Sequence, residues 1–130
     1  MALRLHEKGY NVVGVYDTDS TKSDAVAAAV RGTVAGVLEE VTAISNIIFT
    51  VVTDDQAMQE IFSATNPQSL LTGAQDRIFV NCATLSPHTH TDIQARVEAY
   101  GGHTLEVCMA SSMPQARDGT LYLMCGGKRE

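Results

Sequence analysis

Short apolar runs alternate with amphipathic stretches along this 130-residue chain. The apolar runs are rich in valine and isoleucine, which favours strands, and the amphipathic stretches carry capping residues and closing glycines, which favours helices. Strands are predicted at 11–17, 46–52, 77–82, 103–110 and 120–127, with a further short apolar piece at 33–36. Helices are predicted at 1–8, 18–32, 37–45, 53–64, 67–73 and 86–102.

Strands that alternate with helices predict an α/β fold, with a mostly parallel, doubly wound sheet and helices on both faces. The run at 46–52 carries no charge, so we expect a strand that is buried on both faces. Asp54 or Asp55 is expected to cap the helix that follows. Ser86 and Pro87 have the residue types preferred at a helix N-cap and first turn.

Composition narrows the classes of function. The formal net charge is -6, which argues against a nucleic-acid binder and against attraction to an anionic membrane. No apolar run approaches the roughly 18 residues of a spanning helix. The three cysteines are an odd number, which favours a reduced compartment over a disulfide framework. We therefore expect a cytoplasmic, globular domain.

Asp17 ends a valine-rich strand, as does the ribose-binding acid of a dinucleotide-binding unit. That acid lies about 20 residues beyond a glycine-rich turn, so the turn and its strand would precede residue 1. Because the chain also opens on a helix and closes directly after a strand, we expect it to be cut at both ends. The alternative for Asp17 is a local turn or capping role within 17–21, and spacing alone leaves both open.

Four stretches, MALRLHEKGYNVVGVYD, NIIFTVVTDDQAM, FVNCATLSP and GGHTLEVCMASSMPQARDGTLYLMCGG, together resemble the β-hydroxyacid dehydrogenases. This family includes 3-hydroxyisobutyrate dehydrogenase and the cofactor domain of 6-phosphogluconate dehydrogenase. The last stretch is the most specific, because it keeps the order and spacing of several family residues.

The resemblance implies that residues 1–130 are an incomplete, Rossmann-like NAD(P)-binding domain, which lacks the first strand, the glycine-rich turn and the family's C-terminal helical domain. It implies hydride transfer between a nicotinamide cofactor and a small β-hydroxyacid substrate, in a full-length protein that is a homo-oligomer. The family's catalytic lysine would lie outside this chain, since Lys128 follows the closing glycines too closely, so no catalytic residue is expected here. Asp17, with no arginine near it, favours NAD over NADP.

The resemblance also assigns residues to binding roles. The implied cofactor-binding residues are Asp17, Thr53, Asp54, Met58 and Thr84. The implied substrate-binding residues are Asn81, Thr84, Ser111 and Ser112. The residue types themselves equally permit simpler roles: helix capping for Asp54, core packing for Met58, and turn hydrogen bonds for the threonine and serines.

Departures from the family pattern leave the substrate open. Asn81 replaces the usual Asp of the substrate motif, and Ala83 replaces its Ser. Further along, Glu106 stands for Asp and Cys108 for Pro. These positions belong to the family's substrate segments, so the sequence leaves the choice of substrate open even within the same lineage.

Two alternatives belong to other classes. Without the glycine-rich turn, the chain could be an inactive nucleotide-binding fragment or an interaction module. Cys82 with a histidine base would suit a hydrolase, but a lone cysteine at a strand end more often serves packing. His88 and His90 face differently on a helix, so they cannot serve one site together. No zinc-type spacing of cysteine and histidine occurs, and we expect no metal site.

Overall fold

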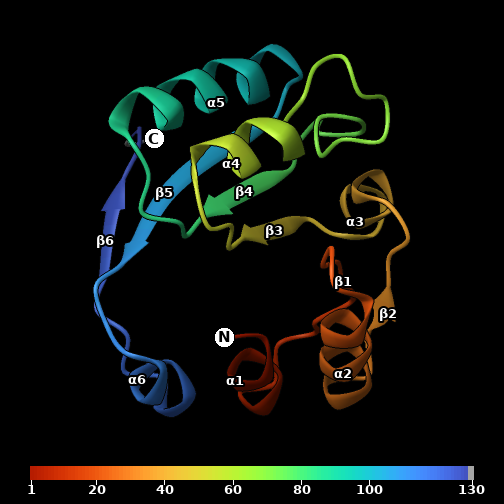
Figure 1. Ribbon diagram of the computed structural model, residues 1–130, viewed down its shortest axis with the longest axis vertical. Coiled ribbons are helices and arrows are strands. Elements are labelled where there is room, and N and C mark those ends of the chain that lie inside the picture. The colour runs from red at the N-terminus through yellow and green to blue at the C-terminus, as the bar shows by residue number, and fades with distance from the viewer. Residues whose placement is uncertain (129–130) are drawn as a thin grey trace.

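The computed structural model describes residues 1–128, and its helices lie on both sides of its strands (Figure 1). This arrangement confirms the predicted α/β class. Among the described residues, no helix combines the length and the apolar character that crossing a bilayer requires. In chain order the elements are α1 (Ala2–Glu7), β1 (Gly14–Val15), α2 (Ser20–Val30), β2 (Thr33–Val34), α3 (Leu38–Ile44), β3 (Ile47–Thr50), α4 (Asp55–Ile61), β4 (Ile78–Asn81), α5 (Pro87–Ala99), β5 (His103–Met109), α6 (Met113–Asp118) and β6 (Leu123–Gly126).

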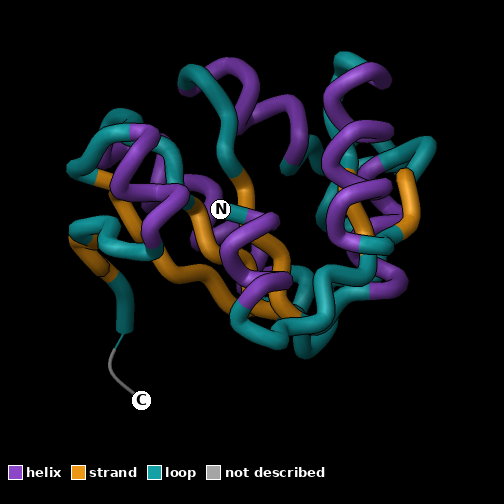
Figure 2. The backbone as a smooth tube through the Cα atoms, turned by 90° about the horizontal axis from the view of Figure 1, so that it is seen from below, coloured by secondary structure: helices purple, strands orange, loops and turns teal. Residues whose placement is uncertain are grey.

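The strands form two separate sheets. The larger sheet has the order β3-β4-β5-β6, in which β3, β4 and β5 are parallel and β6 is antiparallel. The smaller sheet is the parallel pair β1-β2, which lies beside the larger one in both ribbon and tube views (Figures 1 and 2). The edge of β1 and the edge of β3 are not paired with each other. The predicted parallel sheet is therefore present, in two parts.

One face of the larger sheet carries the main core. Phe79 of β4 is fully buried there and meets Phe62 edge-on, with ring centroids 5.2 Å apart. Ile93 of α5 and Met58 of α4 are also fully buried in this cluster. Apolar residues at helical spacing on α4 and α5 thus cover the strand residues that point toward them.

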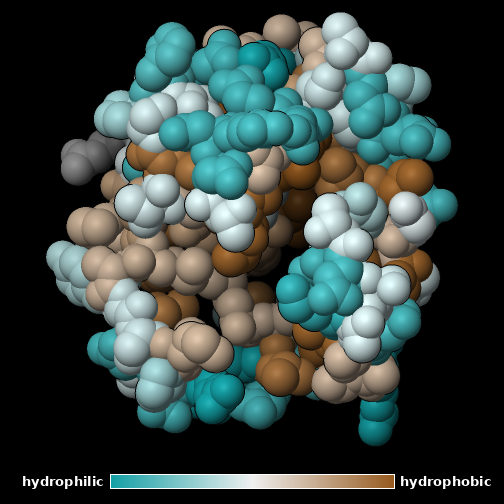
Figure 3. Space-filling view, in the orientation of Figure 1, coloured by the Kyte–Doolittle hydropathy of each residue, from teal (hydrophilic) through white to brown (hydrophobic). Residues whose placement is uncertain are grey.

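The opposite face is only partly covered, which corrects the expectation for 46–52. Ile47 and Phe49 of β3 are 53% and 45% exposed, and Val51 beyond the strand is 61% exposed. A second, smaller cluster covers the same face farther along, around Val80 and Val107. The space-filling view shows a hollow bordered by hydrophobic residues in this part of the molecule (Figure 3). An uncharged strand sequence specifies two apolar faces, but neighbouring elements decide whether both are covered.

Several predicted helix termini are confirmed. The Asp54 carboxylate accepts a hydrogen bond from the Ala57 backbone N–H at 2.8 Å, and the Ser86 hydroxyl accepts one from Thr89 at 3.3 Å. Pro87 occupies the first turn of α5, where its missing N–H has no cost. Local sequence signals therefore place the helix starts that adjoin the strand ends.

Three local expectations are wrong. Residues 67–73 form turns where a short helix was expected. The polar stretch after β5, for which no helix was predicted, forms α6, and Ser112 and Gln115 form a capping box at its start. Arg31, and not Gly32, takes the left-handed position at the end of α2, with φ of 57°.

Replacing Arg31 by glycine is expected to raise the free energy of unfolding by about 1 kcal/mol, because glycine removes the Cβ strain of a left-handed residue. Urea unfolding of the two proteins measures the difference. Arg31→Ala is the matched control, since it removes the side chain and keeps the Cβ. Equal stability of the glycine and alanine variants would show that this position is not strained.

Candidate functional site

The residues assigned to ligands follow the carboxyl ends of strands. Thr53 and Asp54 follow β3, Thr84 follows β4, and Ser111 and Ser112 follow β5. These three strands are parallel, so their carboxyl ends lie at one edge of the sheet. In sheets of this kind, that edge is where ligands bind.

The loop after β3 is tied to the start of α4. Thr53 Oγ1 donates to Asp54 Oδ2 at 3.2 Å, and both residues are exposed. Through the hydrogen bond from the Ala57 backbone N–H, Asp54 also caps α4, as its residue type predicts. Met58 is fully buried in the core, so its side chain presents no surface to a cofactor in this structure.

Asp55 links this loop to the next one, a contact that the sequence did not indicate. Its Oδ1 accepts hydrogen bonds from the Ser86 backbone N–H and hydroxyl, each at 3.1 Å. The Ser86 hydroxyl also lies 3.0 Å from Thr89 Oγ1. Hydrogen bonding from the Thr89 side chain first, and then from Ser86, lowers the pKa of Asp55 below its ordinary value of 3.8. The carboxylate thereby joins the N-termini of α4 and α5.

Asp55→Asn is expected to destabilise the fold modestly at neutral pH, because the amide keeps the shape of the side chain and loses its charge. A carboxyl group with a lowered folded pKa contributes stability above its ordinary pKa, and that stability is lost as the pH falls through the folded value. The difference between wild type and variant should therefore shrink below about pH 4. Thermal unfolding measured from about pH 2.5 to about pH 7, a range that spans the titration of carboxyl groups, checks this. A difference that stays constant with pH would contradict the role of the charge.

The serines after β5 make the turn contacts that their residue types permit. Ser111 Oγ accepts from the Tyr122 backbone N–H at 2.8 Å, which holds β6 against the loop. Ser112 lies at the N-cap of α6, where its hydroxyl donates to Gln115 Oε1 at 2.9 Å. Thr84 lies just beyond the end of β4, next to buried Ala83, and is exposed, as is Ser112. Because the hydroxyl groups of Ser111 and Ser112 already make these turn and cap contacts, that of Thr84 is the best placed of the three for a ligand.

Asn81 is buried, and its Oδ1 accepts a hydrogen bond from Thr50 Oγ1 at 2.8 Å. It also borders a pocket of about 190 Å³ between α5, β5 and β6. The same pocket is lined by His90 and Glu106. The structure thus places this predicted substrate residue beside two residues that the sequence did not bring together with it.

Asp17 lies just beyond β1, in the smaller sheet. Its Oδ1 accepts a hydrogen bond from the Asp19 backbone N–H at 2.8 Å, which is the turn role that the sequence left open. Asp19, and not Asp17, caps α2. Because Asp17 is exposed, its carboxylate remains accessible to a ribose hydroxyl.

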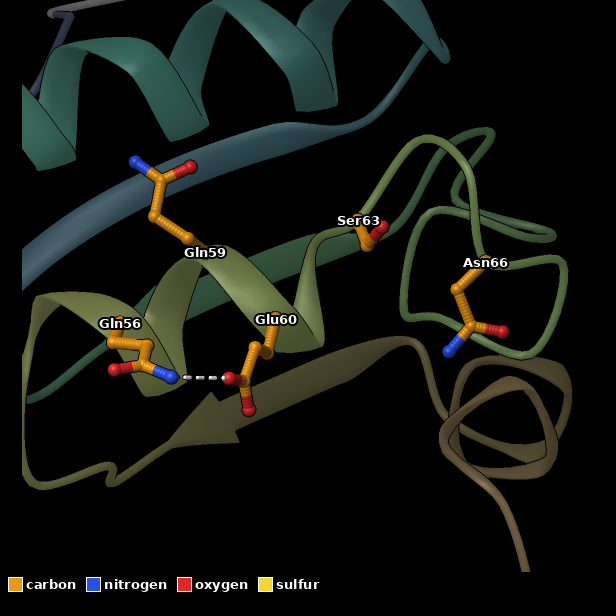
Figure 4. A pocket seen from close by; sticks show the side chains of 5 residues that line it. All are labelled: Gln56, Gln59, Glu60, Ser63 and Asn66. Carbon is orange, nitrogen blue, oxygen red and sulfur yellow. Dashed lines mark hydrogen bonds between the residues drawn. The ribbon is translucent and has the colours of Figure 1, made fainter.

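A second pocket, of about 450 Å³, lies along α4 and the loop after it. Figure 4 shows its polar side chains, of which Gln56 and Glu60 are joined by a hydrogen bond of 2.8 Å. Ser63 and Asn66 complete the lining from the loop. None of the residues assigned to ligands lines this pocket, so it is no part of the candidate site.

Cys82 is a packing residue. It is 2% exposed, and its thiol donates to the Val80 carbonyl at 3.7 Å. Burial, and after it repulsion from the thiolate forms of Cys108 and Cys125, raises the pKa of Cys82 to about 11. A buried thiol with a raised pKa is a poor nucleophile at neutral pH, which argues against a hydrolase based on Cys82.

Thiol labelling at neutral pH is expected to modify Cys125 rapidly, because this residue is exposed, and to leave Cys82 intact until the protein unfolds. Iodoacetamide followed by mass spectrometry of peptides measures the two rates. Cys125→Ser should abolish the rapid phase. Rapid labelling of Cys82 in the folded chain would revive the hydrolase alternative.

The sequence profile of the NAD-binding domain of 6-phosphogluconate dehydrogenase matches residues 1–130. The chain belongs to this family of NAD-binding domains. Family membership confirms the resemblance inferred from the four sequence stretches. It also gives the domain a nicotinamide cofactor, without deciding between NAD and NADP.

Curated relatives of this NAD-binding domain include the cytokine-like nuclear factor N-PAC. That of Aedes aegypti is 28% identical over 129 residues, which are 99% of this chain and 22% of the relative. That of Danio rerio is 28% identical over 91 residues, which are 69% of this chain and 19% of the relative. The chain therefore spans about a fifth of the length of these relatives.

Solved structures share the fold of this NAD-binding domain. Mycobacterium tuberculosis 3-hydroxyisobutyrate dehydrogenase, solved with L-serine, has a TM-score of 0.85 at 21% identity and covers 98% of this chain and 42% of its own. Streptomyces aurantiacus imine reductase has a TM-score of 0.84 at 20% identity, and the match covers 98% of this chain and 43% of the reductase chain. Psf3, in complex with NADP+ and 2-OPP, has a TM-score of 0.87 at 20% identity, and the match covers 98% of this chain and 44% of the Psf3 chain.

Proposed function

We propose that the protein is an NAD(P)-dependent oxidoreductase of the 3-hydroxyacid dehydrogenase type, which transfers hydride between the nicotinamide and a small β-hydroxyacid. The observation that carries this proposal is the family match over the whole chain, together with polar residues at the carboxyl ends of β3, β4 and β5. The bound cofactor supplies the hydride acceptor or donor. The residues of this chain bind the cofactor and orient it.

Asp17 fits a ribose, because its exposed carboxylate can accept from two hydroxyl groups. Thr53 and Asp54 offer exposed oxygen atoms near the strand end, and exposed Thr84 can donate to a carboxamide or a carboxylate. Asn81, Ser111 and Ser112 are proposed to contact the substrate directly or through the loop that they hold. Met58 does not fit a cofactor contact, since it has no exposed surface.

We propose that a further parallel strand lies between β1 and β3, supplied by chain outside these 130 residues together with the glycine-rich turn. The free edges of β1 and β3 and the exposed side chains of Ile47, Phe49 and Val51 support this. Amide hydrogen exchange of β3 tests it, since a new partner strand should slow exchange at this edge. Unchanged exchange in the completed domain would refute the placement.

The proposal extends to the surroundings of the site. The catalytic lysine would come from the C-terminal helical domain, and this domain would also make the protein a homo-oligomer. The protein would be cytoplasmic. It would bind NAD more tightly than NADP. An inactive nucleotide-binding or interaction module is the second candidate, favoured by the relatives that are named nuclear factors.

Turnover separates the two candidates. The complete protein should reduce NAD+ with a small β-hydroxyacid, followed by the absorbance of NADH. Thr84→Val, which keeps the shape and removes the hydroxyl, should lower kcat/KM, whereas Thr65→Val, at an exposed position in the loop after α4, should not. Tight NADH binding without turnover on any tested hydroxyacid would support the inactive module.

A further inference from the structure

Three ligand-type side chains that are separated in sequence meet beneath α5. His90 comes from α5, and Glu106 and Cys108 come from the same face of β5. His90 Nε2 lies 3.7 Å from Glu106 Oε1, and Cys108 Sγ lies 3.2 Å from the same oxygen. The three potential ligand atoms all lie within 4.8 Å of one another.

The histidine nitrogen has no partner among the described residues. His90 is 9% exposed, and its Nε2 is buried without a hydrogen bond. The distance of 3.7 Å to Glu106 is too long for a hydrogen bond. Leaving a buried polar atom unsatisfied is unfavourable, and this nitrogen lies within 4.8 Å of the carboxylate oxygen and the thiol sulfur. This unsatisfied nitrogen points to a ligand that the three side chains share.

We propose that His90, Glu106 and Cys108 bind one Zn²⁺ ion. Zinc accepts nitrogen, oxygen and sulfur ligands in one site. Its bond lengths of about 2.0–2.3 Å place tetrahedral ligands about 3.3–3.8 Å apart. The distances from Glu106 Oε1 to His90 Nε2 and to Cys108 Sγ are already close to this range. Small side-chain movements would bring all three ligand atoms to the spacing of a zinc site.

The ion would replace the thiol proton. In the metal-free protein the Cys108 S–H donates to Glu106, and its sulfur also lies 3.7 Å from the Ala83 carbonyl. Burial, and then the carboxylate of Glu106, raises the pKa of this thiol. Zinc binds thiolates and neutralises the charge that burial disfavours, so one proton leaves Cys108 as the Zn–S bond forms.

Three protein ligands leave the fourth tetrahedral position open. The pocket of about 190 Å³ beside His90 and Glu106 gives that position access to solvent. Gln94, Thr104 and Gly126 also line this pocket. A water molecule or a small anionic ligand can therefore complete the coordination, as in zinc sites that keep an open position.

Zinc and cobalt titrations of the chain, measured without nicotinamide, test the proposal. Zn²⁺ should bind with a stoichiometry of one ion per chain and raise the melting temperature. Co²⁺ should give a thiolate-to-cobalt charge-transfer band, which reports a sulfur ligand directly. Cys108→Ser should abolish this band, and His90→Gln should weaken binding by at least about tenfold.

Matched controls exist for both variants. Cys125→Ser and His88→Gln alter an exposed thiol and an exposed imidazole, and both should leave the band and the affinity unchanged. Circular dichroism confirms that the Cys108 and His90 variants fold, and Glu106→Gln provides a third variant if one does not. Absence of binding at near-equimolar zinc, or a band that follows Cys125, would overturn the proposal.

Discussion

Phe79→Ala is expected to lower the free energy of unfolding by about 3–5 kcal/mol. Phe79 is fully buried at the centre of the main core and packs edge-on against Phe62, with an interplanar angle of 78°. Truncation removes the buried ring and leaves a cavity that the surrounding α4 and α5 can fill only partly. The loss is a large part of the roughly 5–15 kcal/mol that stabilises a typical domain. Urea unfolding monitored by circular dichroism measures it.

Phe49→Ala is the matched control for this experiment. Phe49 is the same residue type on the neighbouring strand, but it points to the other face of the sheet and is 45% exposed. Its truncation should therefore cost about 1 kcal/mol or less in this chain. Equal losses for Phe49 and Phe79 would mean that both faces of the sheet are covered, contrary to the structure.

Phe79 and Phe49 show which parts of the fold can be predicted from the sequence and which cannot. Val-rich and Ile-rich runs identify the strands, and residues such as Ser86 and Pro87 identify the helix starts, because both depend on local chemistry. The exposure of Phe49 does not follow from its own segment. It depends on whether another strand or helix lies against that face, which is a property of the rest of the fold.

Two local errors have different causes. Ser112 and Gln115 form a capping box, whose S-x-x-Q spacing is readable in the sequence and predicts the start of α6. The turns at 67–73 carry no comparable warning, because their apolar residues Leu70 and Leu71 suit a short helix equally well. There, packing of both leucines into the core decides the conformation.

The candidate site divides in the same way. Capping by Asp54 follows from its position before an amphipathic stretch. The bond from Ser86 to Asp55 spans 31 residues, and the meeting of His90 with Glu106 joins a helix to a strand. No spacing rule relates such residues, because the fold alone brings them together. Sequence patterns therefore locate the strand ends where ligands bind, and the tertiary structure decides which side chains share a site.

Asp17→Ala is expected to weaken NADH binding to the completed domain by about 10- to 100-fold, because hydrogen bonds to a charged group contribute about 1.5–3 kcal/mol. NADPH binding should stay the same or become tighter, because the carboxylate no longer repels the 2′-phosphate. Fluorescence titration with both cofactors measures the two affinities. The wild-type protein should prefer NADH.

Asp17→Asn separates the effect of the Asp17 charge on the cofactor from the effect of its turn hydrogen bond. Its amide oxygen can still accept from the Asp19 backbone N–H, as the carboxylate does at 2.8 Å, so the local turn is retained while the charge is removed. Asp24→Ala, at an exposed position of α2, controls for a general loss of negative charge. If asparagine restores the preference for NADH, the turn and not the charge selects the cofactor. If it weakens that preference as alanine does, the carboxylate itself distinguishes the two nucleotides.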